Sequence, residues 1–149
     1  DAGVEHQHVE RRPPLADRAG HVGSDEWDVF PGTSQAWSHL DGMVSVDENV
    51  FPTQGWAGLT MRTLDLPAQR WSIYWVSSRS GRLFPPVHGG WCGDRGEFYG
   101  DDDDEGRPVR VRYVWERLGP DRARWAQAFA LESGPWEVNW LMEFERVRG

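Results

Sequence analysis

Apolar and polar residues alternate along most of the chain, in short segments separated by Gly, Pro and Asp. A period of two is typical of strands with one buried face, and only a short stretch near residues 13–19 suggests a helical turn. Short strands without intervening helices favour an antiparallel sandwich or barrel over βαβ units. The predicted strands are Val4–Arg11, Asp25–Phe30, Thr33–Leu40, Met43–Phe51, Gly58–Asp65, Arg70–Ser77, Val87–Cys92, Gly96–Asp101, Arg107–Trp115, Arg122–Ala130 and Trp136–Val147.

The breaks between these strands carry turn residues. Asp41-Gly42 suits a two-residue hairpin loop, and Gly119-Pro120-Asp121 and Ser133-Gly134-Pro135 mark further turns. Short connections favour a meander, and closing it into a barrel removes exposed edge strands. We therefore predict one all-β domain over residues 1–149, an antiparallel up-and-down β-barrel of about ten strands. A sandwich is the alternative, and residues 1–22 are expected to form an irregular first strand and loop.

Alternate residues of each barrel strand face the interior, and the apolar row of each strand is expected to be the inner one. A bulge would reverse this assignment for the residues beyond it. The predicted lining includes Leu59, Thr63, Trp71, Ile73, Val109, Val111, Val138 and Phe144, with Ser77 at the rim and Glu137, Asn139, Glu143 and Glu145 facing water. The side chains predicted to bind a substrate are Trp37, Met61, Trp75, Trp115, Trp125, Phe129, Trp140 and Met142.

Glu48 is the polar exception in the row that contains Val44, Val46 and Val50. Burial would raise the pKa of its carboxyl group and let it exchange a proton near neutral pH. The alternative is a rim position, or pairing with an inward-facing Arg, Tyr or Trp. Glu48 is thus a candidate catalytic acid or base.

Three further residues are candidates for the same chemistry. Tyr113 and Gln127 have inward parity and are predicted to orient Glu48 or a ligand, although a buried Gln is more commonly a hydrogen-bonded core group. His39 has the parity of Trp37 and is a separate candidate base.

Metal binding is weakly indicated. His6 and His8 lie on one face of a predicted strand and would supply two ligands, but the spacing places no third ligand beside them. The acidic run Asp101–Glu105 lacks the alternating ligands of a calcium loop, so we predict a solvated hairpin tip. Cys92, which has no partner, is predicted to be a passive strand residue. We expect neither a metal nor another cofactor.

Composition and charge narrow the class of partner. The net charge is −8, so the basic surface expected for binding to nucleic acid or anionic lipid is missing. The chain also has ten Trp, whose large rings suit a core or a binding surface. All sixteen basic residues are Arg, which excludes Schiff-base chemistry and a Walker-type phosphate lysine. A single Cys and the lack of a long apolar run suggest a cytoplasmic protein without a membrane partner. We expect a small apolar or aromatic ligand, and a homodimer stays open.

Seven segments carry a resemblance: Gly23–Trp27, Arg70–Trp75, Gly81–Val87, Gly96–Asp101, Gly106–Arg112, Arg124–Phe129 and Trp136–Phe144. Together they resemble the bacterial domain-of-unknown-function family 1579, and they extend from about Gly23 to near the end of the chain. The resemblance implies a calycin-type, lipocalin-like barrel without a settled activity, because such barrels range from carriers to cyclases. The family and the Arg-only composition suggest a GC-rich bacterium and, by analogy, secondary metabolism. His6-Gln7-His8 departs from the family pattern, which has more Arg there.

These observations predict a cofactor-independent enzyme of the cyclase, isomerase or dehydratase type that acts on an apolar intermediate. Glu48 would move the proton, while aromatic walls hold a flexible substrate in one reactive conformer. The first alternative is a carrier or binding protein for small hydrophobic ligands, and the second is a haem- or metal-binding barrel that uses the histidines.

Overall fold

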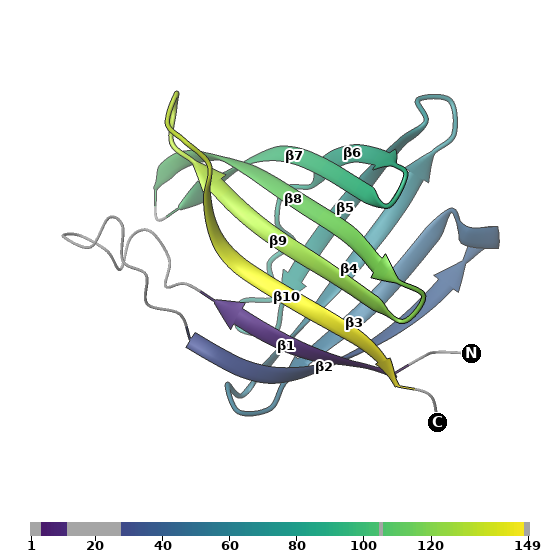
Figure 1. Ribbon diagram of the computed structural model, residues 1–149. Helices are drawn as coiled ribbons and strands as arrows, with labels where there is room; N and C mark the ends of the chain where they lie inside the picture. Colours follow the sequence, from purple (N-terminus) through teal and green to yellow (C-terminus); the bar gives the residue numbers. More distant parts are fainter. Residues whose placement is uncertain (1–3, 12–27, 105, 148–149) are drawn as a thin grey trace.

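A computed structural model describes the backbone of residues 4–11, 28–104 and 106–147, and the side chains from residue 29 onward within these ranges. The described residues form ten antiparallel strands and one 3-10 turn at Leu40–Gly42 (Figure 1). The strands are β1 Val4–Arg11, β2 Asp28–His39, β3 Val44–Phe51, β4 Trp56–Asp65, β5 Arg70–Ser77, β6 Val87–Cys92, β7 Arg95–Asp104, β8 Arg107–Gly119, β9 Arg122–Ala130 and β10 Glu137–Val147.

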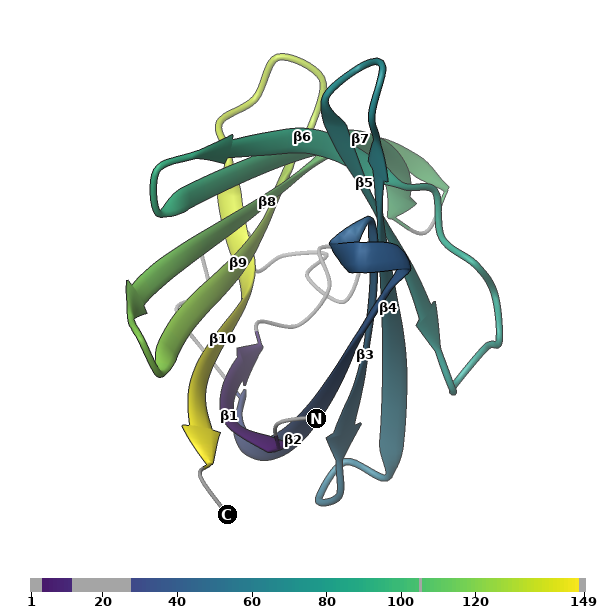
Figure 2. The ribbon, with the colours of Figure 1, turned by 90° about the vertical axis from the view of Figure 1, so that its right-hand side faces the viewer.

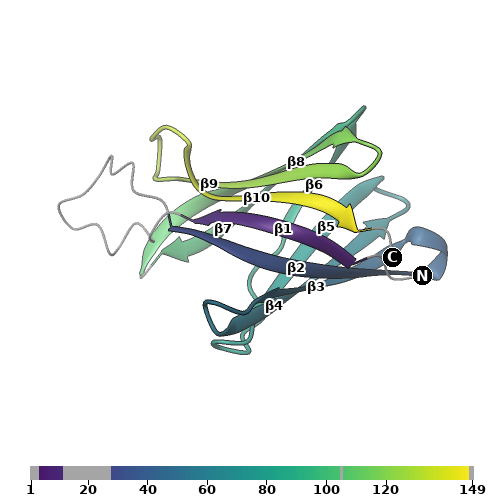
Figure 3. The same cartoon turned by 60° about the horizontal axis from the view of Figure 1, so that its bottom comes forward.

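Each strand pairs with the next, and β1 closes the barrel between β2 and β10. It forms eight residue pairs with each neighbour, and Figure 3 shows the three strands side by side. The thinnest seam is β5–β6, with three residue pairs against ten for β7–β8. The predicted antiparallel up-and-down barrel is confirmed, and the described residues contain no helix suited to crossing a membrane.

The barrel has two ends that carry different connections. The start of β1, the end of β10 and the turns after β2, β4, β6 and β8 lie at one end, which we call the terminal end; it faces the viewer in Figure 2. The turns after β3, β5, β7 and β9 lie at the other, the loop end. A residue's position along its strand therefore fixes its depth in the barrel.

Strand β2 runs without interruption through Pro31-Gly32, where the sequence predicts a break. Pro31 pairs with His8 of β1, and Gly32 faces the interior. A Cβ atom at Gly32 would lie 2.8 Å from Cδ1 of Phe51, so glycine here allows the aromatic ring to pack directly on the backbone. The two predicted strands on either side of this dipeptide are one element.

The connection between β2 and β3 is longer than the predicted two-residue loop at Asp41-Gly42. Leu40 and Asp41 have positive φ angles of 51° and 53°, and the Met43 N–H donates to the Leu40 carbonyl at 3.1 Å. The tight backbone reversal is therefore a 3-10 turn that includes these residues. The helical turn predicted near residues 13–19 lies outside the described residues.

Aromatic rings fill much of the interior. The ring centroid of Trp140 lies 5.7 Å from those of Trp56 and Trp125, 6.0 Å from Trp75 and 6.2 Å from Phe51. Most of these pairs are edge-to-face or tilted, the arrangement that ring quadrupoles favour. A second cluster of Ile73, Val87, Phe98, Val109 and Val111 packs beside it.

Candidate functional site

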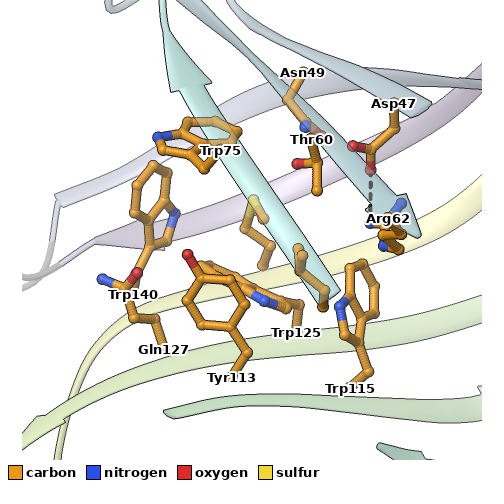
Figure 4. Close-up of a pocket in the computed structure, with 12 residues that line it drawn as sticks. Asp47, Asn49, Thr60, Arg62, Trp75, Tyr113, Trp115, Trp125, Gln127 and Trp140 are labelled. Atoms are coloured by element: carbon orange, nitrogen blue, oxygen red, sulfur yellow. Dashed lines mark hydrogen bonds and ion pairs between the residues drawn. The ribbon is translucent and has the colours of Figure 1, made fainter. Parts of the chain in front are cut away.

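Two cavities lie inside the described part of the barrel. The inner cavity has a volume of about 30 Å³, and the outer cavity, at the loop end, has a volume of about 200 Å³. Trp75, Tyr113, Gln127 and Trp140 border both, so the two cavities adjoin at these four side chains. The other residues that line the inner cavity are Asp47, Asn49, Thr60, Arg62, Ile73, Trp115, Trp125 and Met142 (Figure 4).

Strands β8 and β9 supply one wall of the site, with the predicted parity. Tyr113 pairs with Gln127 and Trp115 with Trp125, and all four line the inner cavity. Phe129, two residues beyond Gln127, lines the outer cavity. The inward placement predicted for these five residues is confirmed, and their roles toward a ligand stay predictions.

Strands β5 and β10 supply further wall residues as predicted, with corrections at the start of β10. Val138, predicted to face the interior, pairs with Ala128, which lies between the inward Gln127 and Phe129, so Val138 belongs to the outer row. Trp75, Trp140 and Met142 face the interior. Asn139, predicted to face water, is instead buried and borders the outer cavity. A register shift between Val138 and Trp140 turns it inward, because a bulge reverses the alternation locally.

The inward amide of Asn139 has a defined partner. Gln127 Nε2 donates a hydrogen bond of 2.9 Å to Asn139 Oδ1. The two amides thus orient each other at the boundary between the cavities. Gln127 is accordingly a hydrogen-bonded interior group, one of the two roles predicted for it.

Strand β3 faces the opposite way from the prediction. Glu48 is exposed on the outer wall, whereas Asp47 and Asn49 are 5% and 1% exposed and line the inner cavity. The expectation that Glu48 lies among inward valines is therefore wrong, and its carboxylate is not placed to act inside the barrel. Shifting the assignment by one residue moves every side chain of a strand to the other face.

Strands β4 and β2 follow the same reversal. Thr60 and Arg62 line the inner cavity, so Met61, between them, belongs to the outer face. Trp37 and His39 are exposed on β2. The predictions that Met61 and Trp37 bind a substrate inside the barrel, and that His39 is an interior base, are wrong on placement. Leu59 and Thr63 share the outward parity of Met61.

The physical reason is the distribution of polarity on these strands. Their outer row is apolar and includes the exposed side chains of Val50 and Leu59, while their inner row carries acid, amide and guanidinium groups. A rule that assigns the apolar row to the interior therefore chooses the wrong face. The polar residues Asp47, Asn49 and Arg62 were missed in the sequence because a row of polar side chains is expected to face solvent.

The inner polar groups form a partly buried ion pair. Arg62 Nη2 lies 3.0 Å from Asp47 Oδ2, and Arg62 Nη1 donates to Ser45 Oγ at 3.5 Å. The Arg62 guanidinium also lies over the Trp115 ring, 5.2 Å from its centroid. The other carboxylate oxygen, Asp47 Oδ1, is buried and accepts no hydrogen bond from the described residues. A buried acceptor without a donor costs about 1–3 kcal/mol.

Tyr113 is a second polar group of the interior. Burial raises the pKa of its phenol, and the nearby Asp102 carboxylate raises it further. The phenol therefore stays protonated at neutral pH and presents a hydroxyl group that can donate a hydrogen bond. Asp102 has a pKa raised by desolvation at the edge of the outer cavity.

The acidic run is a strand segment and not the predicted hairpin tip. Residues 101–104 complete β7 and pair with residues 107–110 of β8. Asp104 is buried, and Asp102, Asp103 and Asp104 border the outer cavity beside Arg79. Part of the negative charge of this acidic run therefore lies at the outer cavity, at the mouth of the barrel.

Metal-ligand candidates do not converge where the structure describes side chains. Within that part of the chain, no group of three or more His, Cys, Asp or Glu side chains is placed to hold a metal ion. The hypothesis for His6 and His8 falls on β1, whose side chains lie outside the described ones. Cys92 is an exposed thiol at the end of β6.

Comparison with known proteins adds no relative. No family model matches this chain, and no curated protein matches it. The resemblance to family 1579 therefore stays a prediction, and the functional argument depends on the geometry of the interior.

Proposed function

We propose that this protein binds a small, mostly aromatic or apolar molecule inside the barrel. The observation that carries the proposal is the outer cavity of about 200 Å³, walled by Trp75, Trp140 and Phe129. Side chains fill most of a protein interior, so a hollow of this size at the mouth of the barrel leaves room for a ligand. Charged and polar side chains, among them Arg79, Asp102 and Asn139, complete the lining, and a concave space that combines apolar walls with polar groups is typical of a ligand site.

The size of the outer cavity limits the ligand. An apolar cavity of about 150 Å³ is known to accept benzene. The outer cavity therefore suits the body of a one- or two-ring molecule. Its walls give stacking surfaces, because the Trp75 and Trp140 rings lie nearly perpendicular, at 86°, with centroids 6.0 Å apart.

A cofactor-independent enzyme is the second candidate function, and the buried Asp47 carboxylate favours it. Glu48 and His39 lie on the outer wall, so an interior acid or base would be Asp47, with Tyr113 and Gln127 as orienting groups. Asp47→Asn should then abolish turnover of a bound ligand while binding persists; turnover unchanged by this substitution would exclude Asp47 as the acid or base. A cytoplasmic location and a role in bacterial secondary metabolism remain predictions from the sequence.

Calorimetric titration with a panel of one- and two-ring aromatic compounds tests the binding proposal. We expect saturable binding by panel members that fit the outer cavity. Trp75→Leu should weaken it at least about tenfold, because a wall of the cavity is lost. Trp91→Leu is the matched control, since Trp91 is exposed and borders neither cavity. Absence of binding by every member, or equal loss in both variants, would overturn the proposal.

A further inference from the structure

The Asp47 carboxylate offers a hydrogen-bond acceptor to the inner cavity. Its Oδ2 atom accepts from Arg62 Nη2 at 3.0 Å, while Oδ1 is buried and accepts nothing from the described residues. Figure 4 shows the pair on one side of the cavity, across from the Trp75 and Trp140 rings. Asp47 lines the inner cavity, whose wall also includes the Trp75 and Trp140 rings.

The charge at this position defines the donor that fits. The Arg62 guanidinium already neutralises the carboxylate, and it is itself held by Ser45 Oγ and by the Trp115 ring. A neutral O–H or N–H group therefore satisfies Oδ1 without adding an unpaired charge to a buried site. A fully cationic group would leave the site with net positive charge, which burial disfavours.

The volumes of the two cavities indicate which part of a ligand each could hold. The inner cavity, of about 30 Å³, exceeds the roughly 10–15 Å³ that one water occupies by the same kind of measure. It has room for a hydroxyl, amino or amide group but not for a ring. The outer cavity, of about 200 Å³, has room for the ring, and both cavities are bordered by Trp75 and Tyr113.

We infer that the ligand is an aromatic molecule with a neutral hydroxyl or N–H group at one end, which donates to Asp47 Oδ1 while the rings occupy the outer cavity. This inference rests on the proposed binding function and adds the ligand class. Asp47 is the specificity-determining residue, because a ligand without the donor would leave a buried acceptor unsatisfied.

Matched pairs of compounds test this assignment by calorimetry. Phenol is compared with toluene, and 2-naphthol with 2-methylnaphthalene, because each pair exchanges a hydroxyl for a methyl group of similar size. We expect the hydroxyl compound to bind at least about tenfold more tightly, which corresponds to about 1.4 kcal/mol. The double variant Asp47→Leu/Arg62→Met removes acceptor and counter-charge together and should abolish the preference. Glu48→Gln, on the outer face of the same strand, is the control and should retain it.

The outcomes separate this inference from the binding proposal. If both members of a pair bind equally to the unmodified protein, the donor inference is wrong and the binding proposal stands. If neither member of any pair binds, both fail. A preference that persists in the double variant would assign donor recognition elsewhere and overturn the role of Asp47. Should the double variant not fold, the smaller double variant Asp47→Ala/Arg62→Ala replaces it, because it also removes the acceptor, and an unchanged preference has the same meaning.

Discussion

Arg62 on β4 donates a 3.0 Å hydrogen bond to Asp47 on β3, and this diagonal contact lies on the inner wall of the barrel. The directly opposed pairs are Ser45 with Arg62 and Asp47 with Thr60, so the guanidinium reaches along the strand toward the loop end. Side-chain exposure is 20% for Arg62 and 8% for Asp47. The pair is therefore largely shielded from solvent, and its loss should be costly.

Arg62→Met should lower the free energy of unfolding by about 3 kcal/mol, because it leaves the Asp47 carboxylate buried without its counter-charge. Because Arg62 is partly exposed, we expect a loss of stability at the low end of the range that is typical for breaking buried ion pairs. Urea denaturation measures it, with Arg95→Met as control. Arg95 pairs with Glu97 on the surface, so that change should cost less than about 1 kcal/mol. Equal costs for the two variants would contradict the burial of the interior pair.

Gly89→Ala should destabilise the barrel by about 3 kcal/mol or more, because a Cβ atom would collide with the carbonyl group of Glu97 on β7. The obstacle is backbone in a paired strand and cannot rotate away. Gly90→Ala is the matched neighbour, since a Cβ there meets nothing within 4 Å. Thermal denaturation of both variants gives the comparison, and similar melting temperatures would show that the β6–β7 approach is looser than described.

His88 should titrate below its ordinary pKa of about 6.5. Desolvation lowers the pKa, Arg70 lowers it further, and the ring lies 2.7 Å from Ser72 Oγ through Nδ1. The unfolded chain then binds more protons than the folded one between the folded pKa and 6.5, so this contribution to stability is lost as pH falls through that window. NMR titration of the His88 ring gives the pKa directly; a value above 6.5 would contradict the environment described.

Glu48→Gln should leave both the unfolding free energy, within about 0.5 kcal/mol, and ligand binding unchanged, because Glu48 is exposed on the outer wall. Chemical denaturation and calorimetry measure the two quantities. A loss of binding in this variant, with the fold intact, would show that Glu48 takes part in the binding site and would contradict the observed parity of β3.

Sequence pattern predicted the barrel and the walls from β5, β8 and β9 because these strands have apolar inner rows. On β8, strict alternation places Tyr113 and Trp115 on one face and Arg112 and Glu116 on the other. The structure agrees, because Tyr113 and Trp115 line the inner cavity. On β3 and β4 the inner row is polar and the outer row apolar, so the same rule fails at Asp47. The burial of Asp47 and Asn49, and their place in the lining of the inner cavity, show which face is inside.

Local irregularities of the backbone could not be predicted from the alternation of apolar and polar residues either. The bulge beside Asn139 alters alternation at one position of β10, and the extension of β7 to Asp104 depends on pairing with β8. Both features place polar groups at the outer cavity, where the sequence predicted solvent. Sequence thus located the aromatic part of the candidate site and missed most of its polar part.

The most direct measurement is the NMR spectrum of the ten Trp side-chain Nε1–H groups during titration with 2-naphthol. Binding inside the barrel should shift the signals of Trp75 and Trp140, assigned by single Phe substitutions, and leave those of the exposed Trp37 and Trp91 in place. Shifts confined to Trp37 and Trp91, or no shift at saturating ligand, would contradict an interior binding site.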